Sequence, residues 1–188
     1  MTTTRADAPT TYDGFEVLDA CHDQMLASLI KLRMLIQRLE HVGPDAEARA
    51  LARDVGTFFA GAARQHHEDE ERHVFPKLLA TGDPDVQQAV LRLQQDHGWI
   101  EEDWLEIAPQ LDAVAMGMST YDLDELKAAV QVFAALSQEH IELEESLVYP
   151  EARSRLLPFE REEMSREMAA RRRMANSHAG RRGGDLLH

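Results

Sequence analysis

The sequence contains a single cysteine, Cys21, and this scarcity excludes two classes of protein. One cysteine cannot form an internal disulfide framework, and it cannot supply the several thiolates of a structural zinc site. A reducing compartment, the cytoplasm, is the location that this cysteine usage favours. Cys21 itself is expected to be a small buried apolar residue rather than a redox centre.

Long apolar runs and an excess of positive charge are also missing. No run approaches the roughly 18 residues of a membrane span, and the polar start MTTTRADAPTTYDG lacks the basic and apolar regions of a secretory signal. The formal net charge of -14 means that most of the surface would repel a nucleic acid or an anionic membrane. The composition therefore predicts a soluble protein with no membrane partner and disfavours nucleic acid as a partner.

Helical periodicity dominates the 188 residues, of which 44% are hydrophobic. Turn-forming stretches are found at HVGPD (41–45), ATGDPD (80–85) and MGMST (116–120). They separate four predicted helices, at about 13–41, 45–79, 84–115 and 121–153. Long helices joined by short turns run antiparallel to their neighbours. The predicted fold class is therefore all-α, with an up-down-up-down four-helix bundle over residues 13–153.

The helix ends carry the residues that are expected there. The predicted N-caps are Asp13, Asp45, Asp83 followed by Pro84, and one of Ser119, Thr120 and Asp122. Three prolines are expected to kink or end helices: Pro76, Pro109 and Pro150. After the bundle, the segment PFEREEMSREMAARRRM predicts an additional C-terminal helix over 154–175, with its glutamates before its arginines, and a flexible basic tail over 176–188.

Two stretches of the chain repeat one pattern: QHHEDEERHVFP at 65–76 and EHIELEESLVYP at 139–150. Each contains a histidine, a glutamate four residues later and an aromatic residue followed by proline. The pairs are His66 with Glu70 and His140 with Glu144. This spacing places both side chains on one helix face, about 6 Å apart along the axis, so each pair could hold a metal ion.

An upstream histidine extends the repeat. His22 and His97 are 75 residues apart, and His66 and His140 are 74 residues apart. Two offsets that agree to within one residue indicate an internal duplication. A single one of these residues would more simply be a solvated position on an acidic helix, but the repeated constellation favours a metal site.

The predicted metal ligands are His22, His66, Glu70, His97, Glu101, His140 and Glu144. Imidazole and carboxylate donors suit iron, manganese or zinc. The repeat is imperfect, because Glu101 stands four residues after His97 whereas Leu26 stands four after His22. One metal would then have one ligand fewer, and an open position is where a small ligand could bind.

Three histidines near these motifs are interpreted separately. His67 is rotated by about 100° from His66, which favours a surface position. His73 shares a face with Glu70, so its ligation or outer contact stays open. His41, at a helix end, is expected to interact with the helix dipole.

Four further residues near the motifs are either alternative ligands or neighbours of the site. Glu71 and Glu145 each follow a favoured carboxylate by one residue and are the less favoured ligands, although Glu145 stays an alternative. Trp99 and Tyr149 are expected to fill the core, with a potential role as hydrogen-bond donors beside the site.

The chain resembles the hemerythrin-like, or HHE cation-binding, family over about 15–153. The residues that carry the resemblance are His22, His66 and Glu70 before VFP, His97, and His140 and Glu144 before VYP. The resemblance implies a four-helix bundle with a non-haem di-iron centre: two iron ions (Fe2+/Fe3+), oxo- or hydroxo-bridged, with terminal histidines and the bridging carboxylates Glu70 and Glu144. Oxygen carriers of the family have histidine where this chain has Glu101, which makes reversible dioxygen storage less favoured. Their fourth-helix carboxylate lies one residue further along, which keeps Glu145 open.

The expected function is binding of, or reaction with, dioxygen, peroxide or nitric oxide, in oxidative or nitrosative stress or in iron and oxygen handling. No acid-base residue or organic substrate pocket is visible in the sequence, so no enzymatic reaction is assigned. The alternatives are a redox or oxygen sensor that signals through the C-terminal segment to a protein partner, and a structural zinc bundle. Binding of nucleic acid by the tail arginines is the least favoured interpretation.

Overall fold

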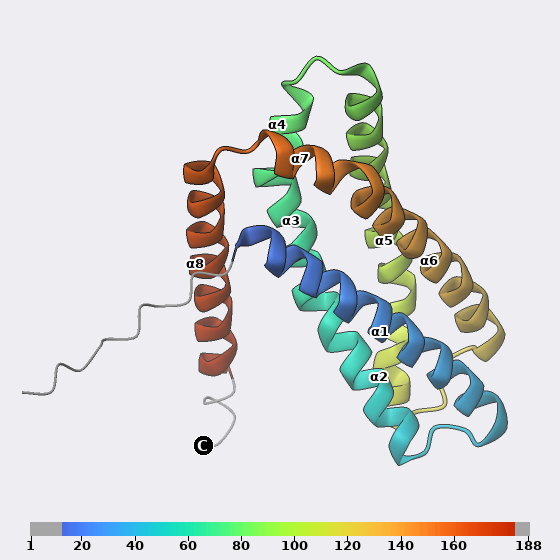
Figure 1. Cartoon of the computed structure of the whole chain (residues 1–188). Coiled ribbons are helices and arrows are strands. Elements are labelled where there is room, and N and C mark those ends of the chain that lie inside the picture. Colours follow the sequence, from blue (N-terminus) through green and yellow to red (C-terminus); the bar gives the residue numbers. More distant parts are fainter. Residues whose placement is uncertain (1–12, 183–188) are drawn as a thin grey trace, which may run out of the picture. The chain divides into compact units, whose positions relative to one another are not determined.

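The computed structural model describes residues 13–182, with side chains up to Met174, and every element in this range is helical (Figure 1). The elements of the bundle are α1 (Gly14–His41), α2 (Ala46–Phe58), the π-helix η1 (Phe59–Ala63), α3 (Arg64–His73), α4 (Phe75–Leu79), α5 (Pro84–Ala115), α6 (Leu123–Leu143), the π-helix η2 (Glu144–Val148) and α7 (Tyr149–Arg155). An additional C-terminal helix, α8, spans Pro158–Arg182. The all-α prediction is confirmed.

Aspartates begin the helices where the sequence predicts. The side chain of Asp45 accepts a hydrogen bond from the Ala48 amide at 2.9 Å, and Asp83 does the same for the Asp85 amide at 3.1 Å. Of the three candidates for the fourth helix, Asp122 is the cap. Each carboxylate satisfies amide groups that have no partner inside the helix and lies at the positive end of the helix dipole. These caps fix where the long helices start.

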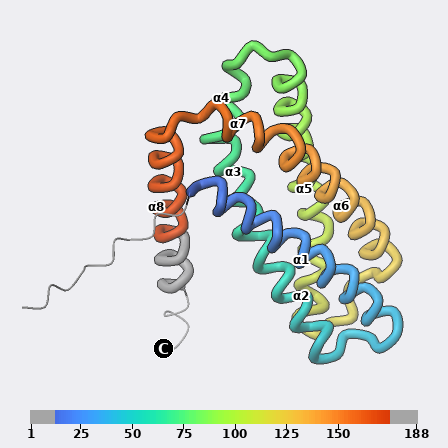
Figure 2. The backbone as a smooth tube through the Cα atoms, in the orientation of Figure 1, coloured from blue at the N-terminus to red at the C-terminus, as the bar shows by residue number. Residues whose placement is uncertain are grey.

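The four long segments surround a common interior. Helix α5 packs against both α2 and α6, and the tube in Figure 2 follows the alternating direction of these segments. Helix α1 is tied to α2 by Lys31 and Asp54, 3.4 Å apart, and to α6 by Arg33 and Gln138, 2.8 Å apart. The resulting order around the bundle is α1, α2, α5, α6, as short connections require.

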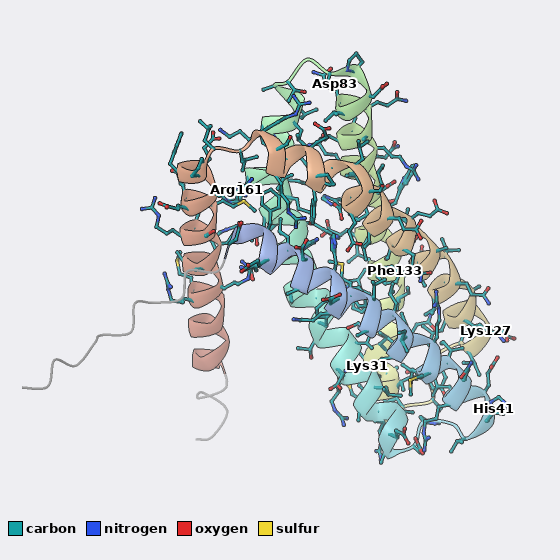
Figure 3. The ribbon with its side chains drawn as sticks, in the orientation of Figure 1. Lys31, His41, Asp83, Lys127, Phe133 and Arg161 are labelled. Atoms are coloured by element: carbon teal, nitrogen blue, oxygen red, sulfur yellow. The ribbon has the colours of Figure 1, made fainter. Side chains whose placement is uncertain are left out.

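Phe133, labelled in Figure 3, belongs to the buried apolar core of the bundle. Its ring is fully buried and lies 5.0 Å from the ring of Phe59 and 5.7 Å from that of Trp104. We expect Phe133→Ala to lower the free energy of unfolding by about 3–5 kcal/mol, because it removes a large buried ring and leaves a cavity. Urea unfolding of the metal-free protein measures this loss. The neighbouring control Val132→Ala, at a side chain that is 60% exposed, should stay within about 0.5 kcal/mol, and equal effects of the two changes would contradict the assignment of Phe133 to the core.

Two of the long segments are not uniform α-helices. The segment predicted over 45–79 includes η1 and is interrupted at Val74, just before Pro76, which has no amide hydrogen to donate. The segment predicted over 121–153 includes η2, which ends just before Pro150. Helix α5 continues through Pro109, so this proline does not end a helix, contrary to one of the predicted outcomes.

The η2 turn changes which side chains share a face. In an α-helix, residues five apart point about 140° away from each other. In η2 the amide of Tyr149 instead donates to the carbonyl of Glu144, five residues earlier, which is the π-helical pattern. Glu144 and Tyr149 therefore both reach the same interior region, although an ideal α-helix would separate them.

Two compact units divide the chain: the unit Leu18–Arg155, and a second unit that contains α8 and the first turn of α1. In the second unit, Met164 of α8 lies close to Gly14, and the Arg161 guanidinium is 3.8 Å from the carboxylate of Asp13. Helix α8 ends at Arg182, beyond the boundary predicted at residue 175. The remainder of the predicted tail, 183–188, lies outside the described residues. Within the described part of the chain, no helix has the length and apolar character needed to cross a membrane.

Candidate metal centre

Histidine and glutamate side chains from α1, α3, α5, α6 and η2 meet inside the Leu18–Arg155 unit. They are His22, His66, Glu70, His97, His140 and Glu144, and none is more than 6% exposed. Their donor atoms form overlapping groups in which all atoms lie within 4.8 Å of one another. Buried charged and polar residues of this kind need partners or a cation. The cluster is therefore the strongest candidate for a functional site.

The first group, which we name position A, consists of His22, His66, Glu70 and Glu144. The Nε2 atom of His22 lies 3.0 Å from Oε2 of Glu144. The Nε2 atom of His66 lies 3.4 Å from Oε1 of Glu70. Position A thus combines two imidazoles with one oxygen from each glutamate.

The second group, position B, consists of Glu70, His97, His140 and Glu144. Here the Nε2 atom of His97 lies 3.4 Å from Oε2 of Glu70, and that of His140 lies 3.1 Å from Oε1 of Glu144. Each glutamate therefore directs one oxygen to position A and the other to position B. The two groups, each of which could hold a metal ion, therefore share both carboxylates.

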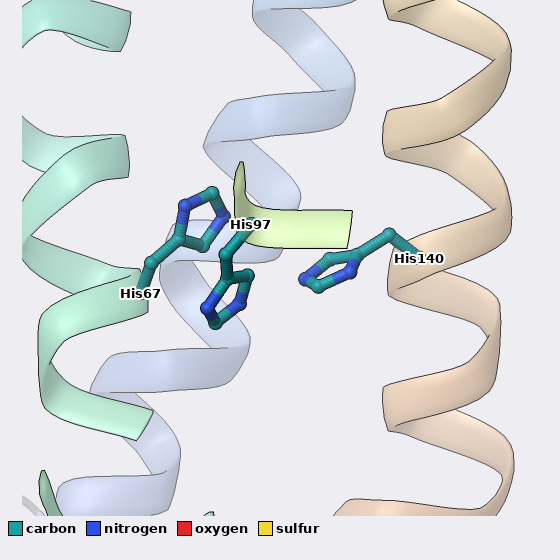
Figure 4. A group of neighbouring side chains, drawn as sticks. All are labelled: His67, His97 and His140. Atoms are coloured by element: carbon teal, nitrogen blue, oxygen red, sulfur yellow. The ribbon is translucent and has the colours of Figure 1, made fainter. Parts of the chain in front are cut away.

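A further histidine, His67, joins position B. His67, His97 and His140 form a third group of converging donor atoms, and Figure 4 shows the three rings gathered from three helices. The ring of His67 stacks on that of His97 with centroids 4.1 Å apart. Although the residue is half-buried, its Nε2 atom is fully buried and makes no hydrogen bond within the described part of the chain. His67 therefore adds a third imidazole that converges with two histidines of position B, His97 and His140.

Two exposed glutamates hold histidines from the outside. The Nδ1 atom of His22 lies 3.1 Å from Oε1 of Glu145, and that of His97 lies 2.8 Å from Oε1 of Glu71. Because Nε2 of each ring faces the cluster, Nδ1 carries the proton and donates it to the glutamate. The two contacts are equivalent under the internal repeat. Such outer carboxylates fix ring orientation and raise the basicity of a ligating imidazole.

The electrostatics of the cluster depend on its two buried carboxylates. Burial and the negative charge of Glu144 raise the pKa of Glu70 to about 7. Burial would also raise the pKa of Glu144, but the positive charge of His140 outweighs it and holds that pKa well below its ordinary value. The reciprocal effect raises the pKa of His140 to about 10 against the opposing effect of burial. Two like charges at this distance need a cation to ionise together.

The donor atoms of the cluster fit a metal ion better than they fit one another. Among the described residues, Nε2 of His66, His97 and His140 makes no hydrogen bond, and the same holds for both oxygens of Glu144. These atoms lie 3.0–3.4 Å from donor atoms of neighbouring residues of the cluster, so a cation between them would satisfy several at once. Burial also lowers the pKa of His66 and His67 well below the ordinary value, which favours the neutral form of the ring that ligates a metal.

A cavity of about 350 Å³ adjoins position B. The side chains of His67 and His97 line it beside an apolar wall that includes Phe59, Trp104 and Phe133. Charged residues complete the lining: Arg64, Glu68, Glu71 and Glu101. The cavity is a route by which a small molecule can reach the histidines of position B.

Residues 13–152 of the chain match the family described as Hemerythrin HHE cation binding domain. The protein belongs to this family. An uncharacterized protein of Haemophilus influenzae is 29% identical over 162 residues, which cover 86% of this chain and 91% of that relative. The hemerythrin-type motif and the buried cluster agree, since the residues that carry the motif are those that converge at positions A and B.

The structure places one predicted ligand outside this hemerythrin-type cluster. The side chain of Glu101 is 58% exposed, and one of its oxygens lies 3.5 Å from the guanidinium of Arg64. It is in none of the donor groups found among the described residues. In this structure the predicted ligand Glu101 instead lies beside Arg64 at the lining of the cavity. The prediction that Trp99 fills the core is wrong, because Trp99 is 47% exposed.

The surface position predicted for His67 is wrong as well. The rotation of about 100° from His66 does not direct His67 to solvent, because the cluster extends across the bundle. His66 faces α1, where its ring lies 4.8 Å from that of His22, whereas His67 faces His97 on α5. His73 is half-buried and belongs to none of the donor groups in the described part of the chain.

Two outer residues carry only a weak sequence signal. Glu71 is recognisable only as the second residue of a glutamate pair that the repeat duplicates at Glu145. Asp96, which is almost fully buried, directly precedes His97, and its Oδ2 atom lies 3.8 Å from Nδ1 of His140. Neither position follows from the i, i+4 rule, because each contacts a histidine of another helix.

We expect Glu71→Ala to weaken binding of one metal ion roughly 10–100-fold, because outer carboxylates contribute about this much to metal affinity. Competition with a metal chelator measures the change. The control is Glu68→Ala, which removes an exposed charge one turn earlier, 3.9 Å from the guanidinium of Arg64. Equal effects of the two substitutions would show that only the net charge matters.

Proposed function

We propose that the protein holds two iron ions at positions A and B, and binds or reacts with dioxygen, peroxide or nitric oxide in oxidative or nitrosative stress or in iron and oxygen handling. The sharing of Glu70 and Glu144 carries the proposal. Each carboxylate has one oxygen near a histidine of position A and the other near a histidine of position B. A single ion would satisfy only half of this arrangement.

The donor chemistry supports iron. Both positions combine imidazole nitrogen with carboxylate oxygen, a set that suits iron and manganese and is accepted by zinc. Membership of the hemerythrin family favours iron among these metals. When bound, an iron pair supplies one-electron redox changes and coordination positions for small ligands.

The residues of the chain control what reaches that pair. His22 and His97 are held in orientation by Glu145 and Glu71, so the rings present Nε2 to the interior. The apolar wall of Phe59, Trp104 and Phe133 limits water beside position B, which favours small uncharged ligands over ions. The cytoplasmic location expected from the composition stays a prediction.

Metal content and the optical spectrum of the protein purified from iron-supplemented cells test the proposal. We expect about two irons per chain and near-ultraviolet bands that bleach with dithionite. These bands should return with air or peroxide, and the order of reactivity identifies the ligand. Zinc alone, or no metal after reconstitution with ferrous iron, would contradict the redox function.

A further inference from the structure

Tyr149 places a hydroxyl group among the donor atoms of position A. The residue follows η2 and is 1% exposed. Its hydroxyl donates to Oε1 of Glu70 at 2.5 Å and lies 3.3 Å from Nε2 of His22. Both of these atoms belong to the group that would hold a metal at position A. The hydroxyl therefore lies directly beside two of the donor atoms of that position.

The spacing of these atoms is that of ligands around one ion. Donor atoms bonded to a metal at about 2.0–2.2 Å and roughly at right angles lie about 3 Å apart. The Tyr149 oxygen lies 3.3 Å from His22 Nε2 and 2.5 Å from Glu70 Oε1, distances on either side of the 3.0 Å between His22 Nε2 and Glu144 Oε2. The same hydroxyl thus lies close to donor atoms of two residues of position A, His22 and Glu70.

Comparison of the two halves of the internal repeat shows that the Tyr149 hydroxyl has no counterpart at position B. The ring of Tyr149 stacks on His22 at 5.1 Å, and the ring of Phe75 stacks on His97 at 5.4 Å in the equivalent place. Position B has a fifth donor, His67, whereas position A has four without Tyr149. The phenol oxygen would bring position A to the same number, with oxygen in place of nitrogen.

We propose, on the basis of the iron centre proposed above, that Tyr149 is a metal ligand at position A. The bond between the phenol oxygen and ferric iron forms as the phenol proton leaves to solvent, with no change of oxidation state. The two irons are then chemically different: position B has a third imidazole and position A a phenolate. An anionic oxygen donor favours the ferric state at position A.

Visible absorption and resonance Raman spectra of the ferric full-length protein test this assignment. We expect a phenolate-to-iron charge-transfer band whose Raman modes are those of a tyrosine ring and shift when ring-deuterated tyrosine is incorporated. The band should disappear in Tyr149→Phe, which keeps the ring that Phe75 shows to be compatible with stacking on a histidine. It should persist in the control Tyr121→Phe, at a tyrosine that packs against the apolar core.

Each outcome decides a separate point. Wild-type protein that holds two irons but has no tyrosine Raman modes would overturn the ligand role of Tyr149 and leave the iron centre standing. Persistence of the band in Tyr149→Phe would also overturn it. Wild-type protein that binds no iron would instead contradict the proposed function on which the ligand role rests. The wild-type spectrum is decisive by itself if the variant does not fold.

Discussion

Replacing Glu144 with alanine is expected to remove metal from both positions at once. The two oxygens of Glu144 lie 3.0 Å from the His22 nitrogen of position A and 3.1 Å from the His140 nitrogen of position B. Loss of an outer carboxylate costs roughly 10–100-fold in metal affinity, so loss of a shared ligand should exceed about 100-fold for each ion. Metal content after gel filtration and chelator competition measure this loss.

The control for this prediction is Glu142→Ala, two residues earlier and exposed. It removes the same charge from the end of α6, directly before η2, and should leave about two ions bound. Unfolding of the metal-free proteins separates a fold defect from a ligand defect, because a metal that binds only the folded chain stabilises it by about 4 kcal/mol at a free concentration 1,000 times its dissociation constant. Retention of one tightly held ion in Glu144→Ala would show that the carboxylate does not bridge.

The second large effect is expected from His67, in contrast to Glu101. We expect His67→Ala to lower the metal content from about two ions per chain to about one, because the variant leaves position B with two imidazoles. Glu101→Ala should leave the metal content unchanged, since its carboxylate is exposed and paired with Arg64. Metal analysis of the two variants, prepared in parallel, measures the difference.

These two substitutions distinguish the sequence-based ligand set from the structural one. If Glu101→Ala lost a metal and His67→Ala did not, the exposed carboxylate would have to move inward on metal binding. The ring stacking between His67 and His97 would then be packing alone. His67 and Glu101 line the same cavity. A substitution that changed only the access of small ligands through this cavity would alter reaction rates and leave the metal content unchanged.

Most of the bundle could be predicted from the sequence because its determinants are local. Helical periodicity, aspartate caps and glycine-containing turns act within a few residues, and Asp45, Asp83 and Asp122 all cap helices as expected. The irregular turns were not predictable in detail. The π-helical η2 depends on how Glu144 and Tyr149 fit the interior, which is a property of the packed bundle.

The ligand set is likewise part predictable from local sequence and part dependent on packing between helices. The i, i+4 spacing identifies His66 with Glu70 and His140 with Glu144, because one helix fixes the relation between those side chains. The spacing alone gives no information on which neighbouring helix a side chain meets. The spacing therefore favoured Glu101 as a ligand, although its side chain is exposed, and a surface position for His67, although its Nε2 atom is buried.

By itself, the sequence determined that the chain is all-α and that a duplicated histidine and glutamate motif places its pairs on helix faces. Family membership over residues 13–152 agrees with both. Only the tertiary structure decided which donors meet: Glu70 and Glu144 divide their oxygens between two positions, His67 enters one position, and the Tyr149 hydroxyl lies beside the other. The physical reason is that spacing along a helix is set by the backbone, whereas contacts between helices depend on how the whole core packs.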